Sequence, residues 1–219
     1  MKPRAFLFDA YGTLFDIHSG ILREGQSIGG DLSTLSAVWR QRQLEHTWLR
    51  SLMECYEDFW DVTQGALLSA LRQLKIEASA PQLEGLMQAY LYPSAFLDVK
   101  AGLQKLKGSP LAILSNGSPK MLESAVNFNQ MELCFTEIIS VDSVKTYKPS
   151  HRVYALGAKT LGLRPSEILF VSSNWWDVAG AKVFGYRVCW CDRSMSEMEF
   201  AELAPDITVH RLDEIADCL

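Results

Sequence analysis

The chain has 219 residues, 48% of them hydrophobic and 11% aromatic, which is enough to bury a substantial core in one domain or two small ones. Its formal net charge of −5 and the lack of a basic run argue against nucleic acid or an anionic membrane as a partner, so we expect small substrates. The sequence shows no signal-peptide core, membrane-spanning window or paired-cysteine motif, and we expect a cytoplasmic protein whose five cysteines are reduced.

The first predicted element is a short apolar strand. Residues 5–8 (AFLF) have the length and aromatic content of a buried strand, and Asp9 follows directly, before a turn that contains Gly12 and Thr13. Ligands of open parallel sheets bind at the carboxyl ends of the strands, so Asp9 is a candidate for chemistry. The alternative is an aspartate that only caps the next helical turn, and this stretch alone does not separate the two.

Helices are predicted next. Residues 31–75 contain no proline and a single glycine, and apolar residues recur there at helical intervals: Leu35, Val38, Trp39, Leu44, Trp48, Leu52, Tyr56 and Phe59. The expected helices are a first one capped by Asp31 or Ser33, a second over residues 63–74, and a third from Pro81 to Tyr90. Together they predict an inserted helical subdomain. Arg40 lies within the first helix, where its residue type alone favours a solvated charge.

Strands and helices alternate in the remainder of the chain. Strands are expected at residues 111–114, 137–140, 168–171, 187–190 and 207–209, with helices around 120–128, 152–161 and 177–184. This alternation predicts an α/β fold with right-handed crossovers and a parallel sheet covered on both faces. The carboxyl end of the first strand and those of the two strands followed by serines should meet at one rim.

That rim gathers residues able to do chemistry, namely Asp9, Ser115, Asn116, Lys148 and Asp177. A first carboxylate, a strand-ending serine, a lysine before proline and a last aspartate at a helix start resemble the four-part signature of the haloacid dehalogenase superfamily. The similarity extends over the whole chain. It implies a Rossmann-like doubly wound core of residues 1–15 and 94–219, with an α-helical cap subdomain of residues 16–93.

The sequence departs from the phosphatases of that superfamily at two places. Those enzymes carry a second Asp, a general acid, two residues after the first, and a G-D-x-x-x-D pattern that helps to hold magnesium. Here Tyr11 replaces the acid, while Ser172 and Ser173 replace the Gly and Asp. Magnesium prefers carboxylate ligands, and a phosphoester leaving group needs a proton. A phosphatase with atypical metal ligation therefore remains an alternative, as does an idle binding protein on the same fold.

The 2-haloacid dehalogenase branch is the better match. The resemblance rests on FDAYGTLFD, WRQRQLEHTWLRSLM, LSNGSP, YKPSHRVY and SSNWWDVAGAK. It implies hydrolysis of short-chain S-2-haloalkanoic acids, including haloacetates, to 2-hydroxy acids and halide, without a metal or other cofactor. A halide leaves as a stable anion, so this reaction has no need of an acid at position 11. Relatives of this branch are commonly homodimers, which is the expectation here.

The resemblance also implies a role for each site residue. Asp9 would attack the halogen-bearing carbon to form an ester, and Asp177 would activate the water that cleaves it. The implied catalytic set is Asp9, Thr13, Arg40, Lys148, Ser172, Asn174 and Asp177. Arg40 and Asn116 would bind the halide, Lys148 would lie beside Asp9, and Thr13 would form a hydrogen bond within the nucleophile loop. Ser172, Asn174 and Tyr154 would support Asp177. The implied substrate-binding set is Tyr11, Gln41, Leu44, Phe59, Ser115, Asn116, Tyr154 and Trp176. For the apolar members, ordinary core packing is an equal alternative. Trp175, where relatives usually have a small residue, is expected to narrow the pocket or halide site.

Overall fold

The structure, a computed structural model, describes residues 2–219. Within them six parallel strands form the main sheet in the order β5-β4-β1-β6-β7-β8. The strands are β1 (Ala5–Phe8), β4 (Leu111–Ser115), β5 (Glu137–Ser140), β6 (Ile168–Ser172), β7 (Arg187–Cys191) and β8 (Ile207–Val209). The predicted α/β fold with a parallel sheet is confirmed, and the expected strands agree with the observed ones to within one residue.

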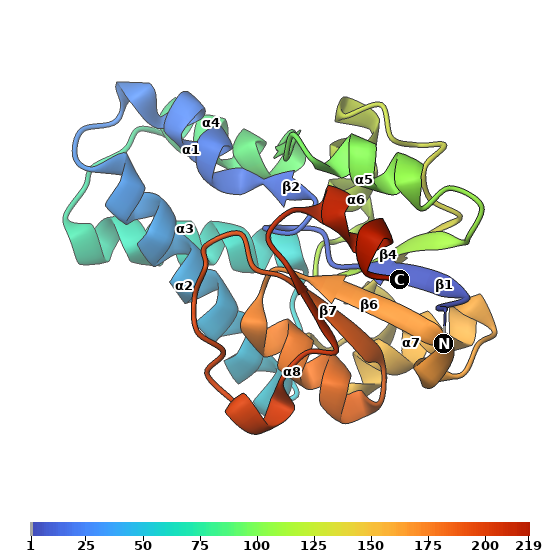
Figure 1. The fold of residues 1–219 in the computed structure, drawn as a ribbon. Coiled ribbons are helices and arrows are strands. Elements are labelled where there is room, and N and C mark those ends of the chain that lie inside the picture. The colour runs from blue at the N-terminus through green and yellow to red at the C-terminus, as the bar shows by residue number, and fades with distance from the viewer. Residues whose placement is uncertain (1) are drawn as a thin grey trace.

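Strand β1 occupies the middle of the sheet. All four of its residues are buried, because helices cover both faces of the sheet. In Figure 1, α5 (Val99–Lys105) and α6 (Pro119–Phe128) lie on one side of the strands, and α7 (His151–Leu161) and α8 (Trp175–Phe184) lie on the other. The strand order reverses at β1, between β4 and β6, so the end of β1 is the position where such sheets bind ligands.

A helical insert, which we define as residues 17–91, separates β1 from the rest of the core. It contains α1 (Ile17–Glu24), α2 (Leu32–Leu52), α3 (Phe59–Leu74) and α4 (Ala80–Leu91). Its two connections to the core are the short antiparallel strands β2 (Phe15–Asp16) and β3 (Ser94–Ala95). The four helices gather on one side of the sheet core in Figure 1.

The insert differs from the expectation in three details. Helix α1 was not expected. Helix α2 stops at Leu52, so Tyr56 and Phe59 do not continue its apolar pattern. Helix α3 begins at Phe59 rather than near residue 63, because the Asp58 carboxylate accepts a hydrogen bond from the Trp60 amide at 2.7 Å and caps the helix there.

One side of α2 is buried within the chain. It carries Leu35, Ser36, Trp39, Gln43 and Thr47, and the Trp39 indole N–H donates to the Thr63 carbonyl of α3 at 2.8 Å. The Trp39 ring also packs on Tyr90 of α4, with ring centroids 4.9 Å apart. This contact joins the three longest helices of the insert into one packed unit.

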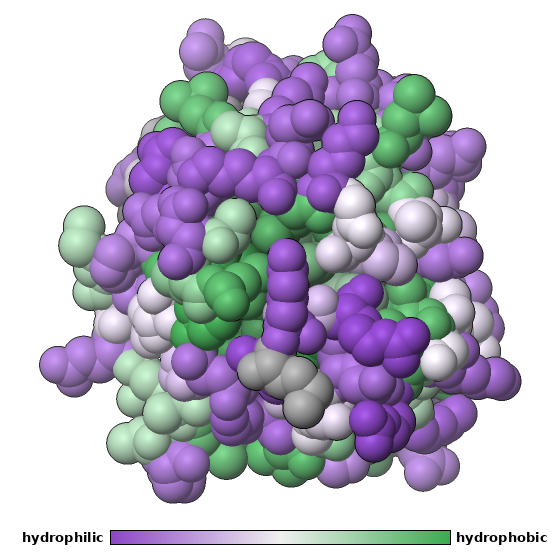
Figure 2. Space-filling view, turned by 45° about the vertical axis from the view of Figure 1, so that its right-hand side comes forward, coloured by the Kyte–Doolittle hydropathy of each residue, from purple (hydrophilic) through white to green (hydrophobic). Residues whose placement is uncertain are grey.

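The face of the molecule in Figure 2 is mostly polar. Figure 2 shows a face on which hydrophilic side chains predominate, with apolar side chains in smaller groups between them. In the part of the chain that the structure describes, no helix is long and apolar enough to span a membrane. Cys189 and Cys191 lie buried in β7 as unpaired thiols, as expected.

Candidate active site

Asp9 stands at the carboxyl end of β1 and is 6% exposed. Its amide donates to the Val171 carbonyl at 2.9 Å, which continues the pairing with β6. The chain then turns at Gly12, whose φ of +88° is strained for any residue with a side chain. The turn directs the Thr13 hydroxyl back to donate to Asp9 Oδ2 at 3.0 Å, as predicted from the resemblance. The same hydroxyl accepts the Ser173 amide at 2.9 Å, so β6 holds the loop in place.

Lys148 lies between two carboxylates. Its side chain is fully buried, and Nζ is 3.0 Å from Asp9 Oδ1 and 2.8 Å from Asp177 Oδ2. Burial would lower the pKa of the ammonium, but the charges of Asp177 and Asp9 outweigh it and raise the pKa above its ordinary value. The Phe170 ring, 4.9 Å from Nζ, adds a cation–π contact. Lys148 therefore stays charged and compensates both acids.

Asp177 lies in the first turn of α8 and is fully buried. Its Oδ1 accepts the Tyr154 hydroxyl at 2.8 Å. Burial raises the pKa of this carboxyl to about 6, with Lys148 opposing the rise and the charge of Asp9 adding to it. A carboxylate with a pKa in that range can accept a proton from water near neutral pH. Burial, followed by the charge of Asp177, also raises the pKa of Tyr154, which remains a neutral donor.

The Asn174 side chain contacts Asp9, whereas its backbone carbonyl accepts the Asp177 amide at 3.0 Å. Its Nδ2 donates to Asp9 Oδ2 at 2.9 Å and lies 3.4 Å from the Tyr11 carbonyl oxygen. Asn174 therefore meets Asp177 through its backbone and not through its side chain: it is the extended N-cap residue of α8, which begins at Trp175, and its side chain makes no capping bond. Ser172 Oγ accepts the Asn174 amide at 3.1 Å and so fixes this turn.

The end of β4 supplies polar groups to the same rim. Ser115 is buried, and its hydroxyl oxygen accepts the Gly117 amide at 3.1 Å. Asn116 uses Oδ1 to accept the Lys148 amide at 2.9 Å, which ties the lysine loop to β4. Among residues 2–219 the Asn116 Nδ2 has no hydrogen-bond acceptor, so it is free to donate to a ligand.

Arg40 reaches toward this rim from α2. It is half-buried, its Nη1 donates to Gln43 Oε1 at 2.7 Å, and its Nη2 lies 3.5 Å from the Tyr11 carbonyl oxygen. The interpretation as a solvated helix charge is therefore wrong. Gln43 was missed by sequence reasoning, although its position three residues after Arg40 places both on one helix face.

Aromatic side chains form the wall next to Asp9. The Tyr11 ring stacks on Phe59 at 6.2 Å and lies 5.8 Å from Tyr90, whose carbonyl accepts the Tyr11 hydroxyl at 3.1 Å. Burial, followed by Tyr90, raises the pKa of Tyr11, so the phenol stays neutral. Tyr90 is a second residue that sequence reasoning missed. Its position after Ala89 in an apolar helix gave no sign of a site.

The remaining predicted pocket residues lie in different surroundings. Leu44 is half-buried on α2, and Trp176 packs edge-on against Trp48 at 5.6 Å. Gln41 is not brought to the site: its side chain is exposed and donates to Glu45 at 3.0 Å. One residue advances a helix by about 100°, so Gln41 faces away from the side that Arg40 and Gln43 share. The Trp175 ring packs edge-on against Phe200 at 5.3 Å.

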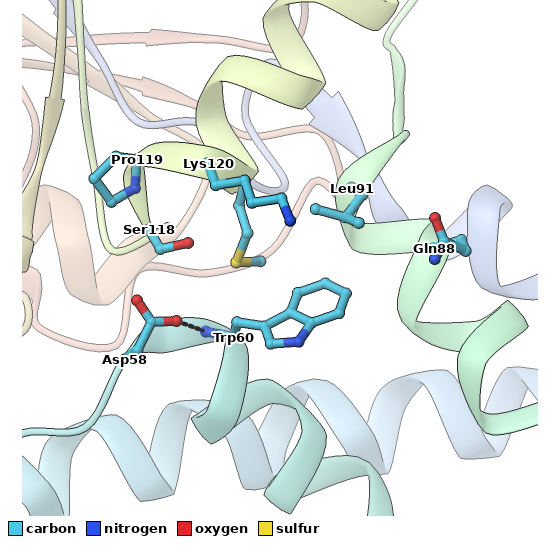
Figure 3. A pocket seen from close by; sticks show the side chains of 8 residues that line it. Asp58, Trp60, Gln88, Leu91, Ser118, Pro119 and Lys120 are labelled. Atoms are coloured by element: carbon cyan, nitrogen blue, oxygen red, sulfur yellow. Dashed lines mark hydrogen bonds between the residues drawn. The ribbon is translucent and has the colours of Figure 1, made fainter. Parts of the chain in front are cut away.

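A cleft of about 540 Å³ lies between the insert and the core, and its lining includes none of the side chains that surround Asp9. Figure 3 shows Trp60 and Lys120 projecting into it from α3 and α6, opposite Leu91 of α4. Its other lining residues are Asp58, Gln88, Ser118, Pro119 and Met121. Asp58 and Ser118 are chain neighbours of Phe59 and Gly117, which pack on the Tyr11 ring. The cleft thus adjoins the aromatic wall, with Asp9 beyond it.

The arrangement combines a carboxylate that could act as a nucleophile, a buried ammonium and a second carboxylate that could act as a base. In the described residues no group of three His, Cys, Asp or Glu side chains is placed to hold a metal ion. The position between the two carboxylates is taken by the Lys148 ammonium.

Comparisons with known proteins agree on one family. The family model for haloacid dehalogenase-like hydrolases matches residues 3–185. The (S)-2-haloacid dehalogenase 4A of Burkholderia cepacia is 43% identical, over 92% of this chain and 88% of the relative. The (S)-2-haloacid dehalogenase of Pseudomonas sp. (strain YL) is also 43% identical, over 98% and 93%. The solved L-2-haloacid dehalogenase of Xanthobacter autotrophicus with chloropropionic acid covalently bound has a TM-score of 0.87 at 35% identity, covering 99% of this chain and 98% of that one.

Proposed function

The chain belongs to the haloacid dehalogenase-like hydrolases and, within them, to the (S)-2-haloacid dehalogenases, and from this premise we propose how its rim residues hydrolyse a carbon–halogen bond. The substrates are short-chain (S)-2-haloalkanoic acids, including haloacetates. The products are the 2-hydroxy acid, inverted at its carbon, and halide. The observation that carries the assignment of roles is the buried Lys148 ammonium, which bridges Asp9 and Asp177. Tyr11, two residues after Asp9, has a raised pKa and stays neutral, so it does not serve as an acid for the leaving group.

In the first step Asp9 is the nucleophile. One carboxylate oxygen forms a bond to the halogen-bearing carbon from the side opposite the halogen, and the halide leaves with the bonding electrons. Lys148, Thr13 and Asn174 hold the carboxylate in place by hydrogen bonds. No proton is needed by the leaving group, which agrees with a neutral Tyr11 at this position.

In the second step water cleaves the aspartyl ester. Asp177 takes a proton from water, whose oxygen attacks the Asp9 carbonyl carbon, and the bond from that carbon to the ester oxygen breaks. The ester oxygen leaves with the bonding electrons and takes up the proton from Asp177, and the second water proton is released to solvent as Asp9 returns to a carboxylate. The hydroxyl oxygen of the product therefore comes from Asp9, and the water oxygen remains on Asp9. Lys148 and Tyr154 orient Asp177 for this role.

The departing halide and the substrate carboxylate need separate partners. Arg40 supplies a cation from the insert, and the free Nδ2 of Asn116 supplies a donor from the core. We assign Ser115, together with backbone amides of the loop after Asp9, to the substrate carboxylate. The Tyr11 and Phe59 rings, with Leu44 and Trp176, are assigned to the alkyl part of the substrate.

The organisation of the molecule is part of the proposal. The core comprises residues 1–15 and 94–219, and residues 16–93 form the cap that carries Arg40. We propose a homodimer through the cap, supported by the exposed apolar side chains Leu49, Leu52 and Met53 at the end of α2. We propose that the enzyme needs no metal, because Ser173 stands where the phosphatase pattern has its magnesium-binding Asp. We also propose a cytoplasmic location.

A halide-release screen tests the reaction. The wild type, assayed in EDTA, should release halide from haloacetates and from only the S enantiomer of 2-chloropropionate. Asp9→Asn should release none. Turnover by a stoichiometric amount of enzyme in water enriched in heavy oxygen should place the heavy isotope in Asp9 and not in the product. Halide release that stops in EDTA, together with magnesium-dependent hydrolysis of p-nitrophenyl phosphate, would instead favour the phosphatase alternative.

A further inference from the structure

A buried chain of hydrogen bonds lies behind Arg40 in the cap. Gln43 is fully buried, and its Oε1 accepts Arg40 Nη1 at 2.7 Å and the Tyr90 hydroxyl at 3.4 Å. Its Nε2 donates to Thr63 Oγ1 at 2.6 Å. The Thr63 hydroxyl in turn donates to the Phe59 carbonyl at 2.6 Å. Two helices of the cap thus converge on one amide.

The direction of these bonds is determined by their chemistry. Thr63 gives its only hydroxyl proton to the Phe59 carbonyl, so toward Gln43 its oxygen can only accept. Gln43 must therefore present its NH₂ group to Thr63 and its carbonyl oxygen to Arg40, because the reverse orientation would set two donors against each other at Arg40. Thr63 thereby fixes the orientation of the amide.

We propose that Gln43, oriented by Thr63, is a positioning residue that holds the Arg40 guanidinium at the halide position. This proposal rests on the proposed function for the role of Arg40, but the hydrogen-bond chain stands on its own contacts. Arg40 has a long flexible side chain, and its contact with the Tyr11 carbonyl is long at 3.5 Å. The 2.7 Å bond to Gln43 is the shorter restraint on the guanidinium.

The same series of hydrogen bonds also links Arg40 to the residues proposed to bind the alkyl part of the substrate. Phe59, whose carbonyl ends the chain, stacks on Tyr11, and Tyr90 bonds to both Gln43 and Tyr11. A substitution of Thr63 is therefore expected to alter the position of Arg40 at the halide site, although Thr63 itself does not contact the substrate. Because small misplacements of a catalytic group can cost up to about 100-fold in rate, a loss of about 10- to 100-fold in kcat is expected.

The first test compares Thr63→Val with Thr63→Ser. Valine keeps the shape but removes the acceptor, whereas serine keeps the hydroxyl, so Thr63→Val should lower kcat and Thr63→Ser should restore most of it. KM should change less than kcat, because the guanidinium is aimed at charge that develops as the halide leaves. The control is Gln64→Met, because Gln64 is exposed on the same helix, and the kcat and KM of this variant should match those of the wild type. Equal loss in both Thr63 variants would overturn the proposal.

The second test is a double-mutant cycle. Gln43→Met should lower kcat strongly in the wild type and cause no further loss in Arg40→Ala, because Gln43 acts through Arg40. Equal losses in both backgrounds would show a merely structural role and overturn the proposal. Thermal unfolding of each variant separates loss of fold from loss of positioning.

A readout independent of turnover separates this proposal from the proposed function. The Arg40 Nε–H signal in nitrogen-15 spectra reports the order of the guanidinium, and it should be ordered in the wild type and in Thr63→Ser but mobile in Thr63→Val. If no haloacid is hydrolysed, this measurement still decides the positioning role. An Arg40 side chain equally ordered in Thr63→Val would refute it.

Discussion

Replacing Lys148 by methionine tests the electrostatics of the site. The variant keeps most of the length of the side chain but removes the ammonium that lies 3.0 Å from Asp9 and 2.8 Å from Asp177. Two buried carboxylates are then left without compensation, which costs about 3–5 kcal/mol of stability when both are charged. Asp177 is expected to escape part of this cost by binding a proton, because its pKa, already raised to about 6 by burial, rises further once Lys148 no longer opposes the rise.

The pH dependence of that loss follows from linkage. In Lys148→Met the native carboxyl pKa lies above the unfolded value of about 4, so the native state binds more protons and stability falls as pH rises toward the native pKa. The slope approaches about 1.4 kcal/mol per pH unit where the native carboxyl is protonated and the unfolded one is not, so the variant is expected to lose more stability at about pH 8 than at about pH 5.5. In the wild type, the raised pKa of Lys148 means that its contribution is fully present below the unfolded lysine pKa, and so is constant over this range.

Urea unfolding of the variant and the wild type at both pH values measures this difference. The wild type gives the baseline, since its Asp177 also has a raised pKa. Lys145→Met is the matched control, because the Lys145 side chain is 62% exposed and its ion pair with Asp142 is of the weak surface kind. A Lys148→Met protein whose loss of stability is the same at both pH values would refute the reasoning. Halide release at the wild-type rate would refute the catalytic role.

Two further predictions concern the base and the aromatic wall. The kcat of the wild type should fall as pH drops below about 6, because Asp177 then carries a proton and cannot accept one from water. A pH–rate profile that stays flat well below that pH would contradict this role of Asp177. Gly117→Ala places a Cβ 2.8 Å from Tyr11 Cε2 and 3.0 Å from Leu122 Cδ2, so it should cost about 1–3 kcal/mol by overpacking and raise KM. Unchanged urea unfolding and an unchanged KM would show that Tyr11 does not form the pocket wall.

The local pattern of residues was sufficient for the fold and for the centre of the site. The apolar run before Asp9 could only be a strand of the sheet interior, and alternating strands and helices admit few topologies. Because parallel strands end at a common edge, Asp9, Ser115 and Ser172 had to lie near one another. These conclusions depend on features that are short-range along the chain.

Details of the insert depended on partners far away in sequence. Helix α1 is short and gave little periodic signal, and the start of α3 depends on a capping bond at Asp58 that a periodic pattern does not reveal. Along α2 the apolar pattern did not show which polar residue faces the site. The fold turned Gln41 to solvent and Gln43 toward Thr63, a difference set by the packing of α2 on α3.

Most of the hydrogen bonds around the two carboxylates could not be predicted from the residue pattern alone. Which carboxylate the Asn174 side chain contacts depends on the turn that precedes α8, and in the structure this side chain donates to Asp9. The sequence placed Lys148 near Asp9 only through resemblance, whereas the folded chain shows its ammonium buried between both acids. Residue type and spacing determine which groups reach the rim, but bond directions and pKa values arise from burial and from neighbours that come together only on folding.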